Sequence, residues 1–179
     1  MAKVTLENLN KIFVSKIGKD VKAVNDFNLL LEDGEILALL GSSGCGKTTT
    51  LRMIAGFETA TSGQIKIGER IVNDLKPADR NVAMAFEGYA LYPPLTVKDN
   101  IAFSLMREKI SKDKVDSKVM EVAELLEITD ILERYPPSIS GGQQQRVSLA
   151  RALVRDSDAL LLDEPMSQLE PQLRAVLRA

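Results

Sequence analysis

Residues 41–48 read Gly41-Ser42-Ser43-Gly44-Cys45-Gly46-Lys47-Thr48, a complete GxxxxGK[ST] pattern between an apolar run at 36–40 and a helix-like stretch at 49–55. Glycines let a backbone wrap closely around phosphates, so that N–H groups and a helix N-terminus face the anion. The lysine reaches the β/γ-phosphates, and the Thr48 hydroxyl can bind Mg²⁺. The pattern predicts a nucleoside triphosphate site with Mg²⁺ as cofactor, on a loop between a strand at 36–40 and a helix.

The composition is that of a globular domain with a real core: 179 residues, 45% hydrophobic and 27% charged. A net charge of -2 offers no basic field, so we expect no nucleic-acid partner. No apolar stretch reaches the roughly 18 residues of a membrane span, and the first residues lack a signal-peptide core, which predicts a cytosolic chain. One cysteine and no histidine exclude an internal disulfide, a zinc site and a histidine relay.

The order of expected elements indicates an α/β core interrupted by a helical insert. Short apolar runs predict strands, and Thr96 and Ser111 are suitable caps for two helices. The expected strands are 4–9, 24–31, 64–67, 82–86 and 159–162, and the expected helices are 97–106, 112–126 and 141–155. Five residues of the second helix share one face and are predicted core: Val115, Val119, Val122, Ala123 and Leu126. We assign 1–87 and 136–179 to an ATP-binding core and 88–135 to the insert.

Two acids, Asp163 and Glu164, follow the last apolar strand. In a phosphate-loop protein this is the expected place for Mg²⁺ and the attacking water. Asp163 would hold a water ligand of Mg²⁺, and Glu164 would orient or deprotonate the attacking water. Without the upstream loop, the same pair would be only a strand end facing solvent.

A second phosphate-facing helix start is predicted at Ser140-Gly141-Gly142-Gln143. Ser140 is a suitable N-cap, and the glycines leave first-turn N–H groups open to an anion. The simpler alternative is an ordinary helix cap after a proline break. Beside the other motifs, the pattern suggests a site for the nucleotide of another molecule.

The segment from Ile139 to Arg146, Ile139-Ser140-Gly141-Gly142-Gln143-Gln144-Gln145-Arg146, resembles the LSGGQ signature of ATP-binding-cassette (ABC) proteins. The resemblance covers nearly the whole chain. It implies an α/β phosphate-loop NTPase core with a mainly parallel sheet, an N-terminal antiparallel β subdomain and a helical insert subdomain. It also implies a head-to-tail dimer with a second copy or a homologous cassette, in which Ser140, Gly141, Gly142 and Gln143 act in trans.

Residues 87–93 and 95–103 are similar to the ATPase subunit of carbohydrate importers of the maltose and glycerol-phosphate type. This implies ATP hydrolysis that drives solute import through an integral-membrane permease, from a cytoplasmic position on the inner face of the membrane. Phe13 matches the adenine-stacking aromatic, with Val24 as an apolar neighbour, and the alternative is that Phe13 is a core residue. Tyr89, Leu91 and Tyr92 are candidates for the permease surface, the alternative being that they only anchor the insert. The implied ATP-binding residues of the loop region are Ser42, Ser43, Gly44, Cys45, Gly46, Lys47, Thr48 and Thr49, with Lys47 also catalytic.

Three departures from the family bear on activity. Glu87 stands where the family has a glutamine that binds Mg²⁺ and the water, and a carboxylate cannot donate a hydrogen bond to water. Glu170 stands where the family has an aspartate in a dimer-contact loop. The chain ends at Ala179, before the family's switch histidine, so the core is expected to be incomplete at the C-terminus. Two alternatives remain: a catalytically impaired ATP-binding fragment, and a non-transport ABC ATPase.

Overall fold

A computed structural model of the chain describes residues 1–15, 18–85, 90–106 and 110–163. The chain forms two compact units, the first of Met1–Ala83 with Ser157–Leu161 and the second of Met84–Asp156 with Leu162–Ala179. The division into an ATP-binding core and an insert at 88–135 stays a prediction.

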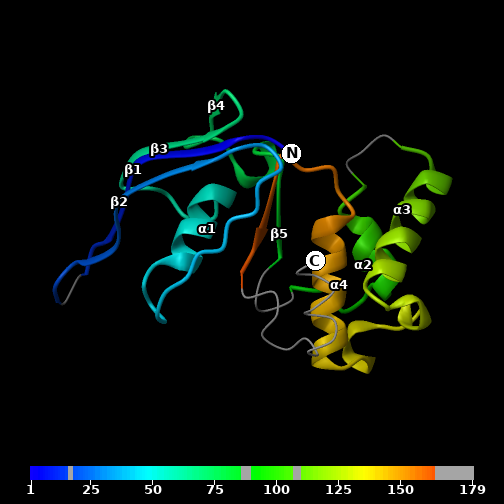
Figure 1. Cartoon of the computed structure of the whole chain (residues 1–179). Helices are drawn as coiled ribbons and strands as arrows, with labels where there is room; N and C mark the ends of the chain where they lie inside the picture. The colour runs from blue at the N-terminus through cyan, green and yellow to red at the C-terminus, as the bar shows by residue number, and fades with distance from the viewer. Residues whose placement is uncertain (16–17, 86–89, 107–109, 164–179) are drawn as a thin grey trace. The chain divides into compact units, whose positions relative to one another are not determined.

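The first unit is built on an antiparallel sheet of four strands in the order β2-β1-β3-β4 (Figure 1). The strands are β1 (Val4–Phe13), β2 (Val21–Leu31), β3 (Ser62–Ile67) and β4 (Arg70–Ile71). Alternating apolar residues of β1 and β3 are buried, as expected for a sheet with one covered face. The register of β1 against β2 shifts between Leu6 and Ile12. Within these shifts Asn8 and Asp26 have φ angles of 48° and 46°, which both residue types tolerate.

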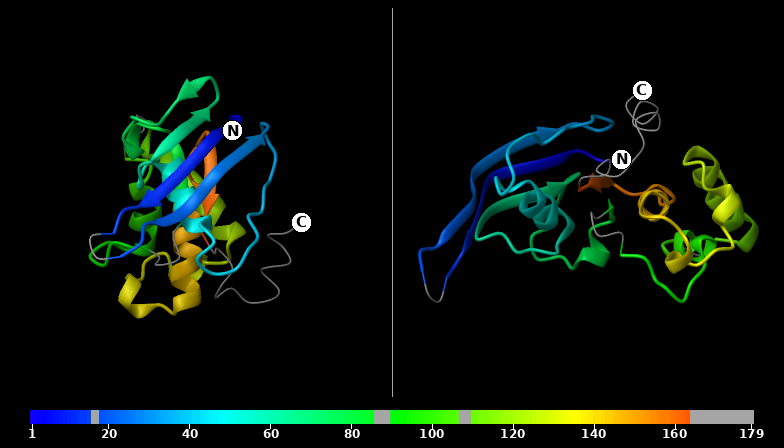
Figure 2. Two further views of the ribbon diagram at one scale, coloured as in Figure 1. Left: turned by 90° about the vertical axis from the view of Figure 1, so that its left-hand side faces the viewer. Right: turned by 90° about the horizontal axis from the view of Figure 1, so that it is seen from below.

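Helix α1 (Lys47–Ala55) lies against one side of this sheet, as the two views of Figure 2 show. Met53, Ile54 and Ala55 on this helix are buried together with the sheet residues Leu6 and Ile65. The helix ends at Gly56, which has a left-handed φ of 85°. The second half of α1 is thus buried in the first unit, while its first turn continues directly from the loop.

The strand predicted at 36–40 is wrong: no strand is assigned there, although all five residues are described. Ile36 and Leu40 are 99% and 91% exposed. An apolar run becomes a strand only when another strand hydrogen-bonds to it, and none of the strands in the described residues pairs with 36–40. The segment therefore leads into the loop as irregular chain.

Two further strands, β5 (Val82–Ala85) and β6 (Ala159–Leu162), pair with each other. The Asp158 N–H donates to the Asn81 oxygen at 2.9 Å, and the Asp163 N–H donates to the Ala85 oxygen at 3.1 Å. Because these bonds follow the same order along both segments, the pair is parallel. Both strands begin and end close to the predicted positions, and Phe86 lies outside the described residues.

The second unit is mainly helical. It contains α2 (Val97–Phe103), α3 (Lys112–Leu125) and α4 (Gly141–Leu153), with short 3₁₀ turns at Thr129–Ile131 and Pro136–Ser138. The Thr96 hydroxyl accepts from the Asp99 N–H and caps α2, as predicted. Ser111 is the N-cap residue of α3, as predicted, but its side chain makes no capping hydrogen bond. All five predicted core residues of α3 pack into one cluster with α2 and α4, where Val115 is partly buried and the others are buried. Helix α2 ends three residues earlier than expected.

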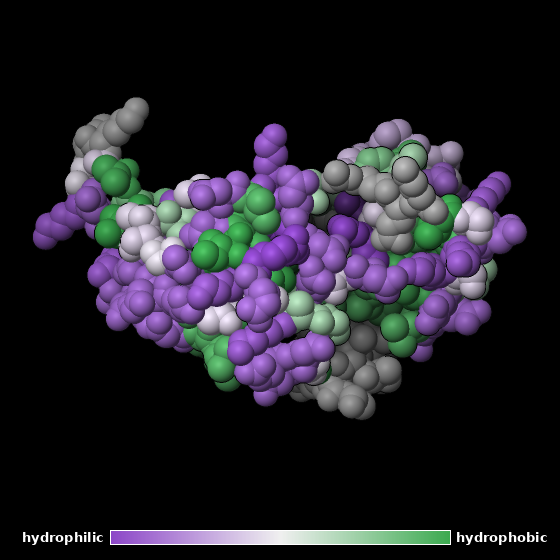
Figure 3. Space-filling view, turned by 90° about the horizontal axis from the view of Figure 1, so that it is seen from above, coloured by the Kyte–Doolittle hydropathy of each residue, from purple (hydrophilic) through white to green (hydrophobic). Residues whose placement is uncertain are grey.

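Hydrophilic residues dominate the space-filling view, and hydrophobic residues appear in separate areas (Figure 3). Such scattered apolar groups are normal on a protein surface. Within the described ranges, no helix is long and apolar enough to span a bilayer.

Candidate nucleotide-binding site

The phosphate-binding loop runs from Gly41 directly into helix α1, so its backbone and the first turn of the helix form one continuous surface. Gly46 is the N-cap with a φ of 94°, and a Cβ there would collide with the Ala23 carbonyl oxygen of β2. Only glycine satisfies both the left-handed backbone and this close approach. Because the cap has no side chain, no side-chain hydrogen bond closes the helix start. A helix N-terminus of this kind attracts an anion.

The Lys47 ammonium lies inside the loop. It donates to the carbonyl oxygens of Gly41 at 2.8 Å and Ser42 at 2.9 Å, and its distance to the Cys45 sulfur is 3.6 Å. Lys47 is the first residue of α1, so its side chain reaches back across the loop that precedes the helix. The charge is therefore held where the sequence pattern predicts the β- and γ-phosphates of a nucleotide.

Thr50 fixes the start of the helix in a way that the sequence pattern did not reveal. Its backbone N–H and its hydroxyl both donate to the Gly46 carbonyl oxygen, at 2.8 and 2.9 Å, and Thr50 is buried. A threonine inside a helix often bonds a carbonyl one turn earlier. Here the second bond holds the Gly46 peptide in orientation at the junction of loop and helix.

The predicted adenine-side residues lie on the strand pair β1 and β2. Phe13, at the end of β1, is 41% exposed, and Val24 on β2 is buried. The Val24 side chain lies next to the loop, since a Cβ on Gly46 would be 3.3 Å from its Cγ2 atom. Val24 thus packs next to the loop at Gly46, and the Phe13 ring is accessible to solvent.

Lys11 and Glu58 form an ion pair beside Phe13 that we did not predict. The Lys11 nitrogen is 2.7 Å from Glu58 Oε1 and 4.8 Å from the centre of the Phe13 ring. The hydrogen bond from Lys11 is the main cause that lowers the pKa of the Glu58 carboxyl. The only signal in the sequence was a lysine two residues before the aromatic, on the same strand face.

In the second unit, the predicted second phosphate site is a helix start closed by a reciprocal cap. The Ser140 hydroxyl accepts from the Gln143 N–H at 3.3 Å, and the Gln143 amide oxygen accepts from the Ser140 N–H at 2.9 Å. Gly141 and Gly142 complete the first turn of α4. The simpler interpretation, a helix cap, is therefore realised in this structure, and Ser140 and Gly141 are also exposed to a ligand.

The predicted acids are only partly described. Asp163 directly follows β6 and is buried, with 6% exposure. Glu87, Glu164 and Glu170 lie outside the described residues. Across the described ranges, no group of three His, Cys, Asp or Glu side chains is placed to hold a metal ion. The described candidates for Mg²⁺ are the hydroxyl of Thr48 and, through water, the carboxylate of Asp163.

Residues 24–167 match the ABC transporter family, and the chain belongs to this family. It is 48% identical over 178 residues to the sn-glycerol-3-phosphate import ATP-binding protein UgpC of Ruegeria pomeroyi, covering 99% of this chain and 49% of that protein. It is 50% identical over 185 residues to the trehalose/maltose import ATP-binding protein MalK of Thermococcus litoralis, covering 100% and 48%. The chain therefore spans about half the length of the curated relatives it matches.

The fold is similar to that of the ATP-binding cassette MJ0796, in a dimeric post-hydrolysis structure bound to ADP and Pi. The TM-score is 0.89 at 28% identity, over 97% of this chain and 79% of that one. The predicted fold class, an α/β cassette with an N-terminal antiparallel sheet and a helical part, is confirmed. Its parallel sheet comprises β5 and β6 within the described residues.

Alkylation of Cys45 is expected to block nucleotide binding. The thiol is exposed and lies 3.6 Å from the Lys47 nitrogen, so an adduct would occupy the predicted phosphate position. Because Cys45 is the only cysteine of the chain, modification is unambiguous. We expect N-ethylmaleimide to abolish binding of a fluorescent nucleotide and excess ATP to slow the modification. Cys45→Ser, with a side chain of similar size, should bind nucleotide and resist the reagent. Full affinity after complete modification would contradict the prediction.

Proposed function

We propose that this chain is the ATP-binding part of a subunit that hydrolyses ATP to energise solute import through a membrane permease. The observation that carries the proposal is the loop at 41–46, with Gly46 starting α1 and Lys47 reaching across the loop. The family and the relatives named as import ATP-binding proteins support it. A sugar or a sugar-like phosphate is the proposed cargo, and the cytoplasmic face of the membrane is the proposed location.

In the proposed site, backbone N–H groups of residues 42–49 hold the phosphates, Lys47 balances their charge, and Phe13 stacks on the adenine. Mg²⁺ would neutralise charge on the phosphates when bound. Mg²⁺ usually keeps several waters and takes few protein ligands beside the phosphates, so one hydroxyl and one carboxylate suit it. We assign Thr48 and Asp163 to this role with Glu87, and we assign the positioning of the attacking water to Glu164.

The proposed working form is a head-to-tail pair of cassettes in which Ser140, Gly141, Gly142 and Gln143 of one copy bind the nucleotide of the other. The dimeric structures of MJ0796 support this arrangement. The exposed first turn of α4 would supply the N–H groups, and the Gln143 side chain would first release its contact with the Ser140 N–H. Glu170 is the proposed additional dimer contact.

The proposed permease surface lies in the second unit around Leu91 and Tyr92, and Tyr89 lies outside the described residues. The centres of the Tyr92 and Phe103 rings lie 4.6 Å apart, and both residues are 41% exposed. The Arg151 guanidinium lies 5.1 Å from the Tyr92 ring and donates to the Ala90 oxygen at 2.6 Å. An exposed aromatic pair held by a cation is suited to protein contact.

One comparison tests this proposal against its alternative, a catalytically impaired ATP-binding fragment. ATP affinity and steady-state phosphate release are measured on the same preparation, with and without Mg²⁺. Binding with Mg²⁺-dependent turnover supports the ATPase. Binding without turnover supports the alternative, and absence of ATP binding contradicts both.

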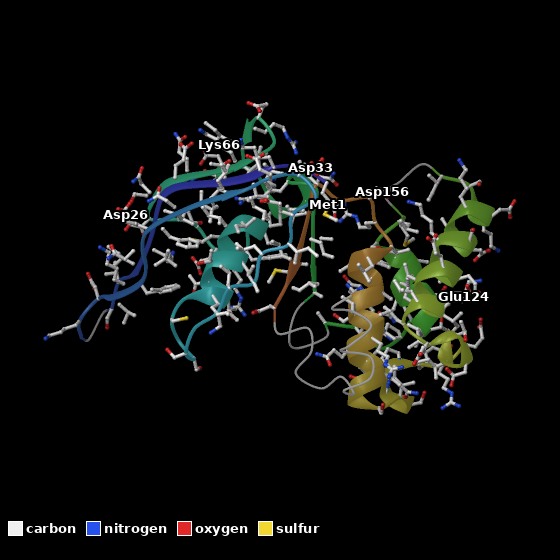
Figure 4. The ribbon with its side chains drawn as sticks, in the orientation of Figure 1. Met1, Asp26, Asp33, Lys66, Glu124 and Asp156 are labelled. Atoms are coloured by element: carbon white, nitrogen blue, oxygen red, sulfur yellow. The ribbon has the colours of Figure 1, made fainter. Side chains whose placement is uncertain are left out.

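Glu87→Gln is expected to raise ATP turnover while changing ATP affinity little. A carboxylate can ligate Mg²⁺, but it cannot donate a hydrogen bond to water, and it adds negative charge near the γ-phosphate. The amide would restore the donor. Steady-state phosphate release and nucleotide affinity check the prediction. Glu124→Gln is the matched control, since Glu124 is exposed on α3 (Figure 4) and should leave both quantities unchanged. Equal turnover of the Glu87→Gln variant and the original chain would contradict the prediction.

A further inference from the structure

Lys11 is more enclosed than the other paired lysines of the sheet, and it has three partners. Its side chain is 12% exposed, against 30% for Lys66 and 42% for Lys3. The ammonium donates to the Thr59 oxygen at 2.8 Å and pairs with Glu58 at 2.7 Å. It also lies 4.8 Å from the centre of the Phe13 ring. One charge thus joins the end of β1 to the segment that follows α1.

Glu58 is tied to the helix that carries the phosphate-binding loop. The N–H groups of Phe57 and Glu58 donate to the Arg52 oxygen of α1, at 2.9 and 3.2 Å. The Thr59 N–H donates to Glu58 Oε1 at 3.1 Å and orients the carboxylate. The position of the Lys11 ammonium is therefore set from the α1 side as well as from its own strand.

The strand register connects this pair to the loop. Lys11 lies opposite Val24, and the Val24 side chain lies next to Gly46 of the loop. Phe13 follows Lys11 by two residues, so both side chains are on the same face of β1. Four residues thus follow one another in space from the loop outward, each next to the one before: Gly46, Val24, Lys11 and Phe13. The ring lies on the strand pair that backs the phosphate-binding loop.

We propose that Lys11 and Glu58 are positioning residues for the nucleotide base: the ammonium holds the Phe13 ring in place so that adenine can stack on its accessible surface. This rests on the proposed role of Phe13. An exposed aromatic side chain loses rotamer freedom when a ligand immobilises it, and a contact that orders the ring beforehand removes part of that loss. A cation near the face of a ring is attracted to it and restrains it.

The test separates binding of the base from binding of the phosphates. A fluorescent ATP labelled on the ribose is displaced from the full chain by ATP, and separately by inorganic tripolyphosphate, which has no base. Lys11→Met is expected to weaken ATP binding about three- to tenfold, the effect of one ordered side chain, and to leave tripolyphosphate binding unchanged. Lys11→Arg keeps a cation that can pair with Glu58 and stack on the ring, so it should restore ATP affinity. Phe13→Ala should weaken ATP binding roughly tenfold or more, as loss of base stacking does.

Lys66→Met is the matched control, because Lys66 forms the same kind of pair with Glu7 at 2.7 Å on the same sheet. Lys66 lies on the side of the sheet away from α1 (Figure 4), and its removal should change neither affinity. Because Lys11 acts through the ring, Lys11→Met should have no further effect in a Phe13→Ala chain. Thermal unfolding by circular dichroism checks that each variant is folded.

The outcomes distinguish this inference from the proposed function. Suppose that Phe13→Ala weakens ATP binding, whereas Lys11→Met leaves ATP binding unchanged or makes ATP binding tighter. The positioning role of Lys11 is then wrong, and the adenine site at Phe13 is unaffected. If Lys11→Met weakens ATP and tripolyphosphate equally, Lys11 supports the fold and the inference is also overturned. If Phe13→Ala leaves ATP affinity unchanged, the assignment of Phe13 fails and the inference fails with it.

Discussion

Lys47→Met is expected to reduce ATP affinity by about 100-fold or more. The ammonium donates to the Gly41 and Ser42 oxygens and is thus held inside the loop. A hydrogen bond to a charged group contributes about 1.5–3 kcal/mol, and the lysine would make such bonds to two phosphates. Methionine keeps the length of the side chain and removes the charge.

Displacement of a ribose-labelled nucleotide measures this loss. Lys76→Met is the matched control, since Lys76 is an exposed lysine of the same unit outside the loop. Tripolyphosphate binding should fall with ATP binding in the Lys47 variant, because Lys47 acts on the phosphates. An unchanged ATP affinity in a folded Lys47→Met chain would contradict the assignment of the loop as the nucleotide site.

The helices could be predicted from the sequence because their starts are encoded locally. Thr96 and Ser140 each accept a hydrogen bond from an N–H three residues later, an interaction that depends only on residues within one turn. The apolar face of α3 could be predicted from the sequence as well, since helical spacing places Val119 and Ala123 on the same face. Local signals of this kind need no knowledge of the rest of the chain.

The segment at 36–40 shows where prediction of secondary structure from the local sequence fails. Its five residues have the composition of a buried strand, and yet Ile36 is fully exposed and no strand is assigned. A strand exists only with a partner, and the partner is chosen by the long-range order of the sheet. The structure does place a loop at 41–46 directly before α1, because glycine spacing specifies backbone geometry without a strand partner. The role of this loop as the nucleotide site stays a prediction.

Residues that act through distant contacts were missed for the same reason. Lys11 contacts a residue 47 positions along the chain, Glu58, and its sequence neighbours give no indication of this. Arg80 precedes β5 by two residues, and its sequence neighbours likewise do not predict that it is buried. In the structure it is 3% exposed, and its acceptors lie in two different segments of the first unit.

Arg80→Met is expected to lower the free energy of unfolding by about 3–5 kcal/mol, the largest stability effect that the described residues suggest. The guanidinium donates to Met53 and Ile54 oxygens at the end of α1, at 2.7 and 3.0 Å, and to Leu75 and Asn73 oxygens, both at 2.9 Å. Burial lowers the pKa of Arg80 from its usual value, and nearby Asp74 acts in the opposite direction. The charge is balanced mainly by the carbonyl ends of a helix, which favour a cation.

Urea unfolding followed by circular dichroism measures the loss. Arg70→Met is the matched control, because Arg70 is half-exposed and pairs with Asp158 at 3.2 Å, and such surface pairs contribute about 0–1 kcal/mol. Gly56→Ala offers an independent check. A Cβ at Gly56 would lie 2.6 Å from the Arg80 Nε atom, and the φ of 85° is already unfavourable for alanine.

Arg80→Met and Gly56→Ala affect the same contact, so the double variant should lose less stability than the sum of the two single losses. Additive losses would contradict the proposed contact, and a loss below about 1 kcal/mol for Arg80→Met would place it among ordinary surface substitutions. Helix α1 begins at the phosphate-binding loop and ends at the Arg80 contact. A folded Arg80→Met chain should therefore also bind ATP more weakly, because the helix that orients the loop has lost the contact that secures its other end.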